Sequence, residues 1–333
     1  MSALRFTSPF VFAASIPALY YLIGPAAPFL TVVALLIALI GAELIARREQ
    51  GPEPQGPLFR ALPNLYVPMQ LAVIAWAVVV VRHSDALGFA ALALPVGVTT
   101  GVFGVLAAHE LVHGHNRAER LLGLLMLTGM SYRHFRVAHI FGHHRYAATA
   151  RDPASARLGE GFYAFLPRTV FAQFADAWSF ETQRTHGRLL ANRIARDVAV
   201  LLTLYLAIAI VLGARSAVFF AVQSAIGIVV LELFNYIAHY GLARRPREPF
   251  TAAHSWNSSN ALANALIFNM GRHSWHHARP AASFESLRYV ATAPELPAGY
   301  AGSILLALVP PLWRRVMDPA VQNLHTPPGN APA

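Results

Sequence analysis

Long apolar segments separated by short turns dominate this sequence. Crossing the hydrocarbon of a bilayer takes about 20 mostly apolar residues, because an α-helix rises about 1.5 Å per residue and the hydrocarbon is about 30 Å thick. Six segments approach that length, and they run approximately from Pro9 to Ile23, Phe29 to Ala46, Tyr66 to Val81, Leu87 to Ala108, Val198 to Leu212 and Ala217 to Tyr236. With 56% hydrophobic and only 13% charged residues, the composition is atypical of a soluble domain. The sequence predicts an all-α integral membrane protein with six transmembrane helices in three hairpins.

Arginine is distributed unevenly among the segments that connect these spans. All 26 Lys and Arg residues are arginines. The turn from Gly24 to Pro28 has none, while those from Arg82 to Ala86 and Gly213 to Ser216 have one each. The positive-inside rule therefore places both termini and the arginine-rich segments in the cytoplasm, in a multi-pass protein of the bacterial inner membrane. The net charge of +10 then suits anionic lipids, and no nucleic-acid partner is expected.

We expect one membrane-embedded domain over residues 1–325. The stretches around residues 117–197 and 240–325 are mixed in polarity and rich in Arg and His, so they predict a cytosolic helical cap. The Pro-rich residues 326–333 are expected to be disordered. The chain has no cysteine, which excludes disulfides, thiolate zinc sites and iron–sulfur ligation. Any electrons must therefore come from another protein or from a cofactor.

Nine histidines gather in four short clusters on the predicted cytosolic side. The clusters contain His109 and His113, then His139, His143 and His144, then His239, and finally His273, His276 and His277. A lone histidine at a membrane boundary is usually an interfacial or packing residue. Nine neutral imidazoles near a low-dielectric boundary gain little except as metal ligands. Their number is enough for two metal ions, and the cap is therefore expected to carry a histidine-rich di-metal site.

The residue pattern alone leaves the metal and the chemistry open. A bare His-Glu-x-x-His, here beginning at His109, would indicate a zinc protease with Glu110 as the general base. Such a site needs only two or three protein ligands, fewer than the clusters offer. Imidazole coordination without thiolates suits iron, copper or zinc, and spacing does not choose among them. A non-catalytic protein that binds or transports metal is a further possibility.

Around these clusters the sequence resembles the membrane-bound alkane hydroxylases (alkane 1-monooxygenases). This family belongs to the integral-membrane di-iron superfamily that also includes fatty-acid desaturases and xylene monooxygenase. The matching segments beyond the first two clusters are Asp152 to Glu160, Phe165 to Arg168, Asn235 to Leu242, His254 to Ser258, Arg272 to His277, Leu296 to Tyr300 and Pro310 to Pro319. The resemblance covers about Phe59 to Pro319. Desaturases share the histidine spacing but lack the patterns around His239 and at the C-terminus.

The resemblance implies a six-helix membrane enzyme with two non-haem iron ions on its cytosolic side, all nine clustered histidines serving as ligands. The implied reaction uses O₂ and inserts one oxygen atom into a terminal C–H bond of an alkane or similar apolar chain, which gives a primary alcohol. The implied electron donor is rubredoxin, reduced by an NADH-dependent rubredoxin reductase. A related desaturase or a xylene-type methyl hydroxylase is the alternative within the superfamily.

Two positions depart from the family pattern. Ala138 and Ala238 stand where the family usually has a Glu beside a ligand. Losing a carboxylate that orients an imidazole typically costs about 10- to 100-fold in metal affinity or activity. A weakened enzyme or a pseudoenzyme is therefore another alternative. The acids proposed for catalysis are Glu110, Asp152 and Glu232. Glu232 is an acid within a predicted span, where a functional role is the default, and helical spacing puts Glu232, Asn235 and His239 on one face.

Two further features bear on how substrate and electrons reach such a site. A face of small residues on the fourth span fits either a corridor for a hydrocarbon chain or close helix packing. Its members are Gly97, Gly101, Gly104 and Ala108. Several arginines near the clusters would suit an acidic electron donor or lipid headgroups. They are Arg145, Arg168, Arg272 and Arg279.

Overall fold

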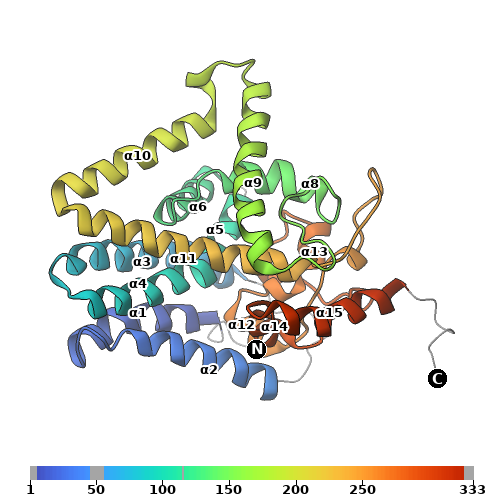
Figure 1. Cartoon of the computed structure of the whole chain (residues 1–333), viewed down its shortest axis with the longest axis horizontal. Helices are drawn as coiled ribbons and strands as arrows, with labels where there is room; N and C mark the ends of the chain where they lie inside the picture. Colours follow the sequence, from blue (N-terminus) through green and yellow to red (C-terminus); the bar gives the residue numbers. More distant parts are fainter. Residues whose placement is uncertain (1–5, 46–55, 115, 326–333) are drawn as a thin grey trace.

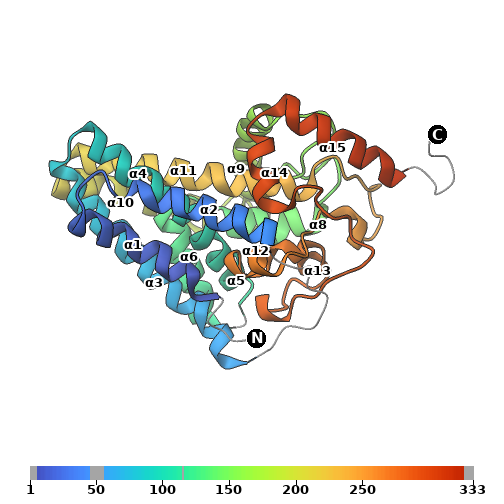
Figure 2. The same cartoon turned by 90° about the horizontal axis from the view of Figure 1, so that it is seen from below.

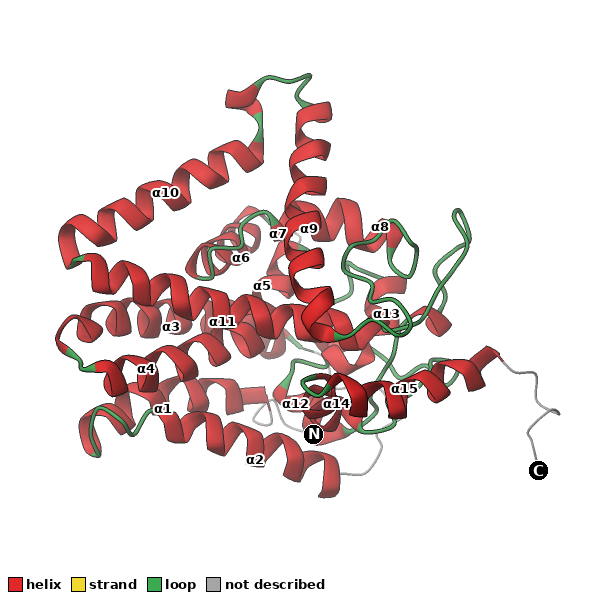
Figure 3. Ribbon diagram, viewed as in Figure 1, coloured by secondary structure: helices red, strands yellow, loops and turns green. Residues whose placement is uncertain are grey.

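The computed structural model describes residues 6–45, 56–114 and 116–325. Within these ranges the regular structure is helical, with one isolated β-bridge between Asn257 and Glu295. The predicted disordered tail, residues 326–333, lies outside the described residues. Long helices lie side by side in one part of the molecule, and shorter helices and loops gather at the other (Figures 1 and 3).

The apolar segments form the long helices. These are α1 (Ser8–Leu22), α2 (Phe29–Ile45), α3 (Pro57–Val80), α4 (Ala86–Thr99), α10 (Arg193–Leu212) and α11 (Ala214–His239). A π-helix over Thr100–Gly104 joins α4 to α5 (Val105–Val112). Four stretches are long and apolar enough to cross a membrane, namely Leu58–His83, Ala86–Val112, Arg193–Leu212 and Ala214–His239. The chain is thus a multi-pass, all-helical membrane protein. α1 and α2 are shorter apolar helices, so the count of six spans in three hairpins remains a prediction.

Two helices begin before the predicted spans. α3 begins at Pro57, nine residues before the predicted span that starts at Tyr66. Proline is tolerated in the first helical turn, where its missing N–H needs no partner, so the helix extends well before the apolar run. α10 begins five residues before the predicted Val198, because the Asn192 side chain accepts hydrogen bonds from the N–H groups of Ile194 and Ala195 and thereby caps the helix.

Small residues on α4 bring this helix against α11. A Cβ at Gly97 would lie 2.6 Å from the Cβ of Ile226, and one at Gly101 would lie 2.8 Å from the carbonyl oxygen of Gly227. Neither position leaves room for a side chain or for a hydrocarbon. The packing interpretation of this face is therefore confirmed at both glycines, and the corridor interpretation is wrong there, because the two backbones occupy the space.

A chain of buried hydrogen bonds ties the helices together inside the apolar bundle. The Gln70 amide donates to the hydroxyl oxygens of Thr99 and Thr100, and the Thr100 hydroxyl donates to the Gln223 side chain. The Gln223 amide in turn donates to the carbonyl of Gly129. Buried polar groups are costly unless they are paired, so these bonds fix the relative positions of α3, α4, α11 and the end of α6.

The remaining elements gather near the ends of α5 and α11. They are α6 (Arg117–Gly129), α7 (Phe135–Val137), a π-helix (Ala138–His143), α8 (His144–Tyr146), α9 (Phe162–Arg184), α12 (Ala261–Leu266), α13 (His273–Ala278), α14 (Gly299–Ala307) and α15 (Pro310–His325). Short 3₁₀ turns cover Val81–His83, Leu189–Ala191, Ala252–His254, Met270–Arg272 and Phe284–Ser286. Both cartoon views place α8 and α13 at one end of the long helices (Figures 1 and 2). All four histidine clusters therefore lie at the same end of the bundle.

Candidate metal centre

A π-helix determines how the second histidine cluster is divided. In the turn over Ala138–His143, the N–H of His144 donates to the carbonyl of His139, five residues earlier. This wider turn brings His139 and His144 to the same side, so that their Nε2 atoms lie 2.9 Å apart. His143 points to a different set of imidazoles. An ordinary α-helix would instead have aligned His139 with His143, because it repeats every 3.6 residues.

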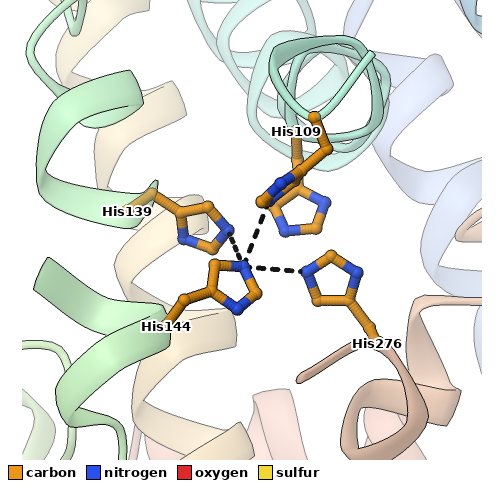
Figure 4. Close-up of side chains that lie close together, drawn as sticks. His109, His139, His144 and His276 are labelled. Carbon is orange, nitrogen blue, oxygen red and sulfur yellow. Dashed lines mark hydrogen bonds between the residues drawn. The ribbon is translucent and has the colours of Figure 1, made fainter. Parts of the chain in front are cut away.

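Five imidazoles meet at one point, and we call them the five-histidine group: His109, His113, His139, His144 and His276. One nitrogen from each lies within 4.8 Å of every other. The Nε2 atom of His144 is 3.1 Å from the Nε2 atoms of both His113 and His276. Figure 4 shows the four labelled rings turned toward one another from three separate parts of the chain.

A second set, the four-histidine group, lies beside the first and comprises His143, His239, His273 and His277. The Nε2 atom of His277 is 3.1 Å from those of both His143 and His273. All four side chains are buried. The two groups meet where the rings of His144 and His277 lie 4.7 Å apart, centroid to centroid. Together they contain all nine histidines that the sequence singled out.

The donor set fits metal ions better than it fits hydrogen bonding. A neutral imidazole carries a single N–H, so the Nε2 of His144 cannot hydrogen-bond at once to the three nitrogens around it. Both ring nitrogens of His109, and the Nε2 of His239, are buried without a hydrogen-bond partner among the described residues. Buried nitrogens with unused lone pairs that converge on a point have the chemistry of ligands. Each group can therefore hold one metal ion.

The protonation states suit that role. Burial lowers the pKa of His139, His144 and His276 well below the usual histidine value, and the neighbouring imidazoles lower it further. The same two causes lower the pKa of His113 to about 4. These rings are therefore neutral at physiological pH, which is the form of imidazole that binds metals.

Three rings of the four-histidine group are oriented by partners on their far sides. His143 Nδ1 lies 2.8 Å from a carboxylate oxygen of Asp152, and His239 Nδ1 lies 3.0 Å from the carbonyl oxygen of His254. His273 Nδ1 lies 3.3 Å from the sulfur of Met270. The first two acceptors keep a proton on Nδ1 and leave the lone pair on Nε2, directed into the group. Asp152 is therefore a partner of a ring, and not a member of the group.

Glu110 and Glu232, the other two acids proposed for catalysis, lie outside both histidine groups. Glu110 accepts a hydrogen bond from the N–H of Phe284 and lines a cavity of about 270 Å³ that also reaches His113. Glu232 is fully buried, and its carboxylate accepts four hydrogen bonds. The donors are the hydroxyls of Tyr132 and Thr169 and the amides of Gln173 and Asn235. Because three of these donors come from outside α11, the hydrogen bonds to Glu232 anchor α9 and the segment around Tyr132 to α11.

An apolar cavity of about 30 Å³ touches both histidine groups. It is lined by His109 and His139 of one group and by His273 of the other, together with side chains that include Phe234 and Ala238. Ala238 thus faces the histidines. Ala138 instead lines a polar cavity of about 220 Å³ with Arg145 and Arg151. The two alanines that replace the family's usual Glu therefore face different surroundings.

Sequence reasoning missed the side chains that pack on the outer faces of the rings. Phe135 stacks on His139 at 4.7 Å between centroids, and Phe250 stacks on His277 at 4.8 Å. Asn257 donates to Ser274 and accepts from its N–H, which holds α13 in place. Only Phe135 lies near its partner in the sequence. No spacing rule could have found the others, because they come from loops whose path depends on tertiary packing.

Comparison with known proteins agrees with this geometry. Residues 84–304 match the family model described as fatty acid desaturase. The chain is 35% identical to alkane 1-monooxygenase 2 of Pseudomonas aeruginosa over 307 residues, which cover 87% of this chain and 81% of the relative. It is 37% identical to the alkane 1-monooxygenase of Pseudomonas putida over 278 residues, 80% of this chain and 69% of the relative.

A more distant relative has a different stated substrate. The hydroxylase component XylM of a xylene/toluene monooxygenase from Pseudomonas putida is 27% identical over 287 residues, which cover 83% of this chain and 78% of the relative. The identities with the alkane 1-monooxygenases are higher and extend over most of the chain. Together with the two buried histidine groups, they show that this chain belongs to the alkane 1-monooxygenase family.

Proposed function

We propose that the two histidine groups hold two iron ions, one in each group. The five-histidine group would supply His109, His113, His139, His144 and His276, and the four-histidine group His143, His239, His273 and His277. Imidazole sets without thiolates suit iron among other metals, and family membership favours iron. The neutral rings, and the orientation of His143 by Asp152, support this assignment.

As a member of this family the chain is an oxidoreductase of the monooxygenase class, and the proposed substrate is an alkane or similar apolar chain. The reaction inserts one atom of O₂ into a terminal C–H bond and gives a primary alcohol and water. When bound, the iron pair supplies an oxidant made from O₂ and two electrons, which side-chain acid–base chemistry cannot replace at an unactivated C–H bond.

The protein's own residues position the ligands and exclude water. The apolar cavity that touches both groups is lined by Val105, Leu106 and Phe234 among others, so it suits a hydrocarbon end rather than a polar group. The buried apolar side chains of this cavity, among them Leu231 and Phe135, keep water away from the sides of the rings that face it. Glu110, Asp152 and Glu232 have supporting positions in this proposal, and a direct catalytic role for any of them remains a prediction.

Electrons must come from outside the chain, because it contains no cysteine and hence no iron–sulfur site of its own. Rubredoxin, reduced by an NADH-dependent rubredoxin reductase, is the proposed donor. The arginine distribution supports a bacterial inner-membrane location with the histidine end and both termini in the cytoplasm. A soluble donor would then reach the centre from the cytoplasm while the substrate arrives from the bilayer.

The convergence of nine imidazoles on two points beside an apolar cavity carries this proposal. The test is metal analysis of the protein purified in nanodiscs, followed by incubation with a medium-chain n-alkane, O₂ and reduced rubredoxin. We expect two irons per chain and the 1-alcohol as product. One zinc per chain, with peptidase activity that needs no O₂, would instead support a zinc protease. Two irons without any product would support a pseudoenzyme.

A xylene-type methyl hydroxylase is the second candidate, favoured by the 27% identity to XylM. Both reactions oxidise a methyl group and place the same demands on the metal ligands. They differ in the shape of the molecule that must fit beside the rings. Competition between an n-alkane and p-xylene at equal concentration distinguishes them, because the preferred substrate gives most of the product. An alkene product would instead indicate a desaturase.

A further inference from the structure

A basic cavity of about 600 Å³ opens beside the histidine groups, and we call it the basic basin. Its lining includes four arginines, Arg145, Arg151, Arg244 and Arg247, against one acid, Glu248. Concave surfaces of one charge sign concentrate partners of the opposite sign and speed their association. We propose that the basic basin is the docking surface for an acidic electron-donor protein.

Among the described residues no basin arginine forms a salt bridge with an acid, and Asp176 of the adjoining polar cavity interacts with Arg151 through space. The Arg244 guanidinium donates to the carbonyls of Ala147, Arg145 and Glu248, so it shapes the rim and remains a cation. Arg145, Arg151 and Arg247 are exposed. The guanidinium of Arg151 lies 4.0 Å from the centroid of the Tyr146 ring, and that of Arg145 lies 5.3 Å from it. The aromatic face holds both cations at the surface without cancelling their charge.

The basin adjoins the point where the two histidine groups meet. Arg145 directly follows His144 of the five-histidine group. The loop that carries Arg247 and Glu248 continues to Phe250, whose ring stacks on His277 of the four-histidine group at 4.8 Å and 23°. The rings of His144 and His277 are themselves 4.7 Å apart. A donor seated in the basin would therefore contact the residue that follows one ligand, His144, and the loop whose Phe250 stacks on another, His277.

The other arginines suggested by the sequence are less suitable. Arg168 binds both oxygens of Glu160 and also the carbonyls of Pro153 and Ser155. Arg272 is 1% exposed and donates to the carbonyl of Leu287, so it cannot contact a docked protein. Arg279 lies over Trp275, away from the basin lining. Of the four predicted positions, only Arg145 belongs to the basin.

The inference rests on the proposed function, which needs two external electrons per turnover. In the balanced reaction an alkane, O₂, two electrons and two protons give the alcohol and water. Each docking event transfers one electron, so that two molecules of the donor are each oxidised by one electron, and the two protons come from water. A small, acidic, one-electron carrier protein such as rubredoxin has the required chemistry.

The test replaces two exposed basin arginines and leaves Arg145 in place, because it adjoins a proposed ligand. The variant R151E/R247E reverses two charges at the basin. The control R188E/R315E makes the same charge change at two exposed arginines elsewhere. In iron-loaded nanodiscs with reduced rubredoxin, R151E/R247E should raise the KM for rubredoxin about tenfold, or about 1.4 kcal/mol in binding free energy. The control should change it less than twofold.

Two measurements keep the result interpretable. Calorimetry measures the binding of rubredoxin without turnover, and the affinity should fall in R151E/R247E but not in R188E/R315E. In the parent protein the affinity should fall as the salt concentration rises. Equal KM values for rubredoxin in R151E/R247E and R188E/R315E would overturn the inference. The inference would also be overturned if R151E/R247E lost only its association with phosphatidylglycerol and bound rubredoxin normally. If rubredoxin binds at the basin but no alcohol forms, the proposed function fails and the docking surface stands. If alcohol forms and the KM for rubredoxin is unaltered in R151E/R247E, the proposed function stands and the docking surface fails.

Discussion

The two histidine groups differ in how the protein holds their rings. In the four-histidine group, His143 and His239 each have a polar acceptor on the outer nitrogen, and His273 faces a sulfur. In the five-histidine group, both nitrogens of His109 and the Nδ1 of His144 have no hydrogen-bond partner among the described residues. There the rings are positioned by packing, for example by the stacking of Phe135 on His139.

This difference indicates two ways of building a site for a metal ion. The four-histidine group has fewer ligands but holds His143 and His239 in preset tautomers, which raises the basicity of those two rings. The Nδ1 of its His277 has no hydrogen-bond partner among the described residues. The five-histidine group has an additional ligand, and packing rather than hydrogen bonding orients rings such as His139. We therefore expect the four-histidine group to depend on every ligand and on its partners. The five-histidine group should tolerate the loss of one ring.

The largest expected effect is the removal of a ligand. His239→Ala leaves three imidazoles in its group, whereas His113→Ala leaves four, enough for a full tetrahedral set. His239→Ala should lower the iron content from two toward one per chain and reduce turnover to about a hundredth of the parent. His113→Ala should retain close to two irons. Mass spectrometry of the metals gives the answer, and equal iron loss in both variants would contradict the comparison.

Asp152 provides the next test, because it touches only the four-histidine group. Asp152→Ala removes the acceptor for His143 Nδ1. It should lower the affinity of the four-histidine group for iron about 10- to 100-fold. A chelator titration measures this loss as a change in the weaker of two dissociation constants. Asp176→Ala is the matched control, since this exposed carboxylate forms no hydrogen bond with a histidine among the described residues. If both iron dissociation constants rise equally, the hydrogen-bond partners of the rings do not account for a difference between the two groups.

The two alanines beside ligands allow a smaller, paired test. Ala238 faces the cavity that touches both groups, so the carboxylate of Ala238→Glu should lie near the metal charge and tighten iron binding about tenfold. Ala138 faces a polar cavity with Arg145 and Arg151. Ala138→Glu should therefore pair with arginine and change iron binding less than twofold. The same chelator titration compares them, and a larger effect at Ala138 would reverse the assignment.

Much of this architecture could be predicted from the residues. Apolar length identified the long helices, since hydrophobic runs must match the bilayer. Clustering identified all nine histidines, because buried imidazoles in such numbers have few other uses. Helical spacing also placed Asn235 on the same face as Glu232, and the two are hydrogen-bonded. These features follow from local composition and periodicity, which a sequence displays directly.

The division of the histidines could not be predicted. Neighbouring His143 and His144 belong to different groups because a π-turn replaces an α-turn, and no spacing rule signals that change. Glu232 lies two helical turns before His239 on α11, and its carboxylate does not reach the histidine groups. Tyr132, Thr169 and Gln173 engage the carboxylate instead, and they approach from segments more than fifty residues away. Tertiary contacts of this kind leave no signal in the local spacing.

His134 offers the smallest test, because it is a buried imidazole in neither group. Its ring packs on Tyr132 at 4.2 Å and on Phe174 at 5.3 Å, and burial lowers its pKa to about 4 from 6.5. The unfolded chain therefore takes up a proton first as pH falls below 6.5. Stability is fully present above that pH and is lost progressively toward pH 4, by about 1 kcal/mol at pH 5.5.

His134→Phe removes this titration while keeping a ring against Tyr132 and Phe174. The apparent free energy of unfolding in detergent should therefore fall less between pH 7.0 and pH 5.5 in the variant than in the parent, by the same amount of about 1 kcal/mol. The other buried histidines titrate in both proteins, so the difference isolates this one ring. If the parent and His134→Phe showed the same pH dependence, burial against aromatic rings would not lower the pKa of His134. The same kind of packing, at His139, would then not suffice to keep an imidazole neutral without a metal.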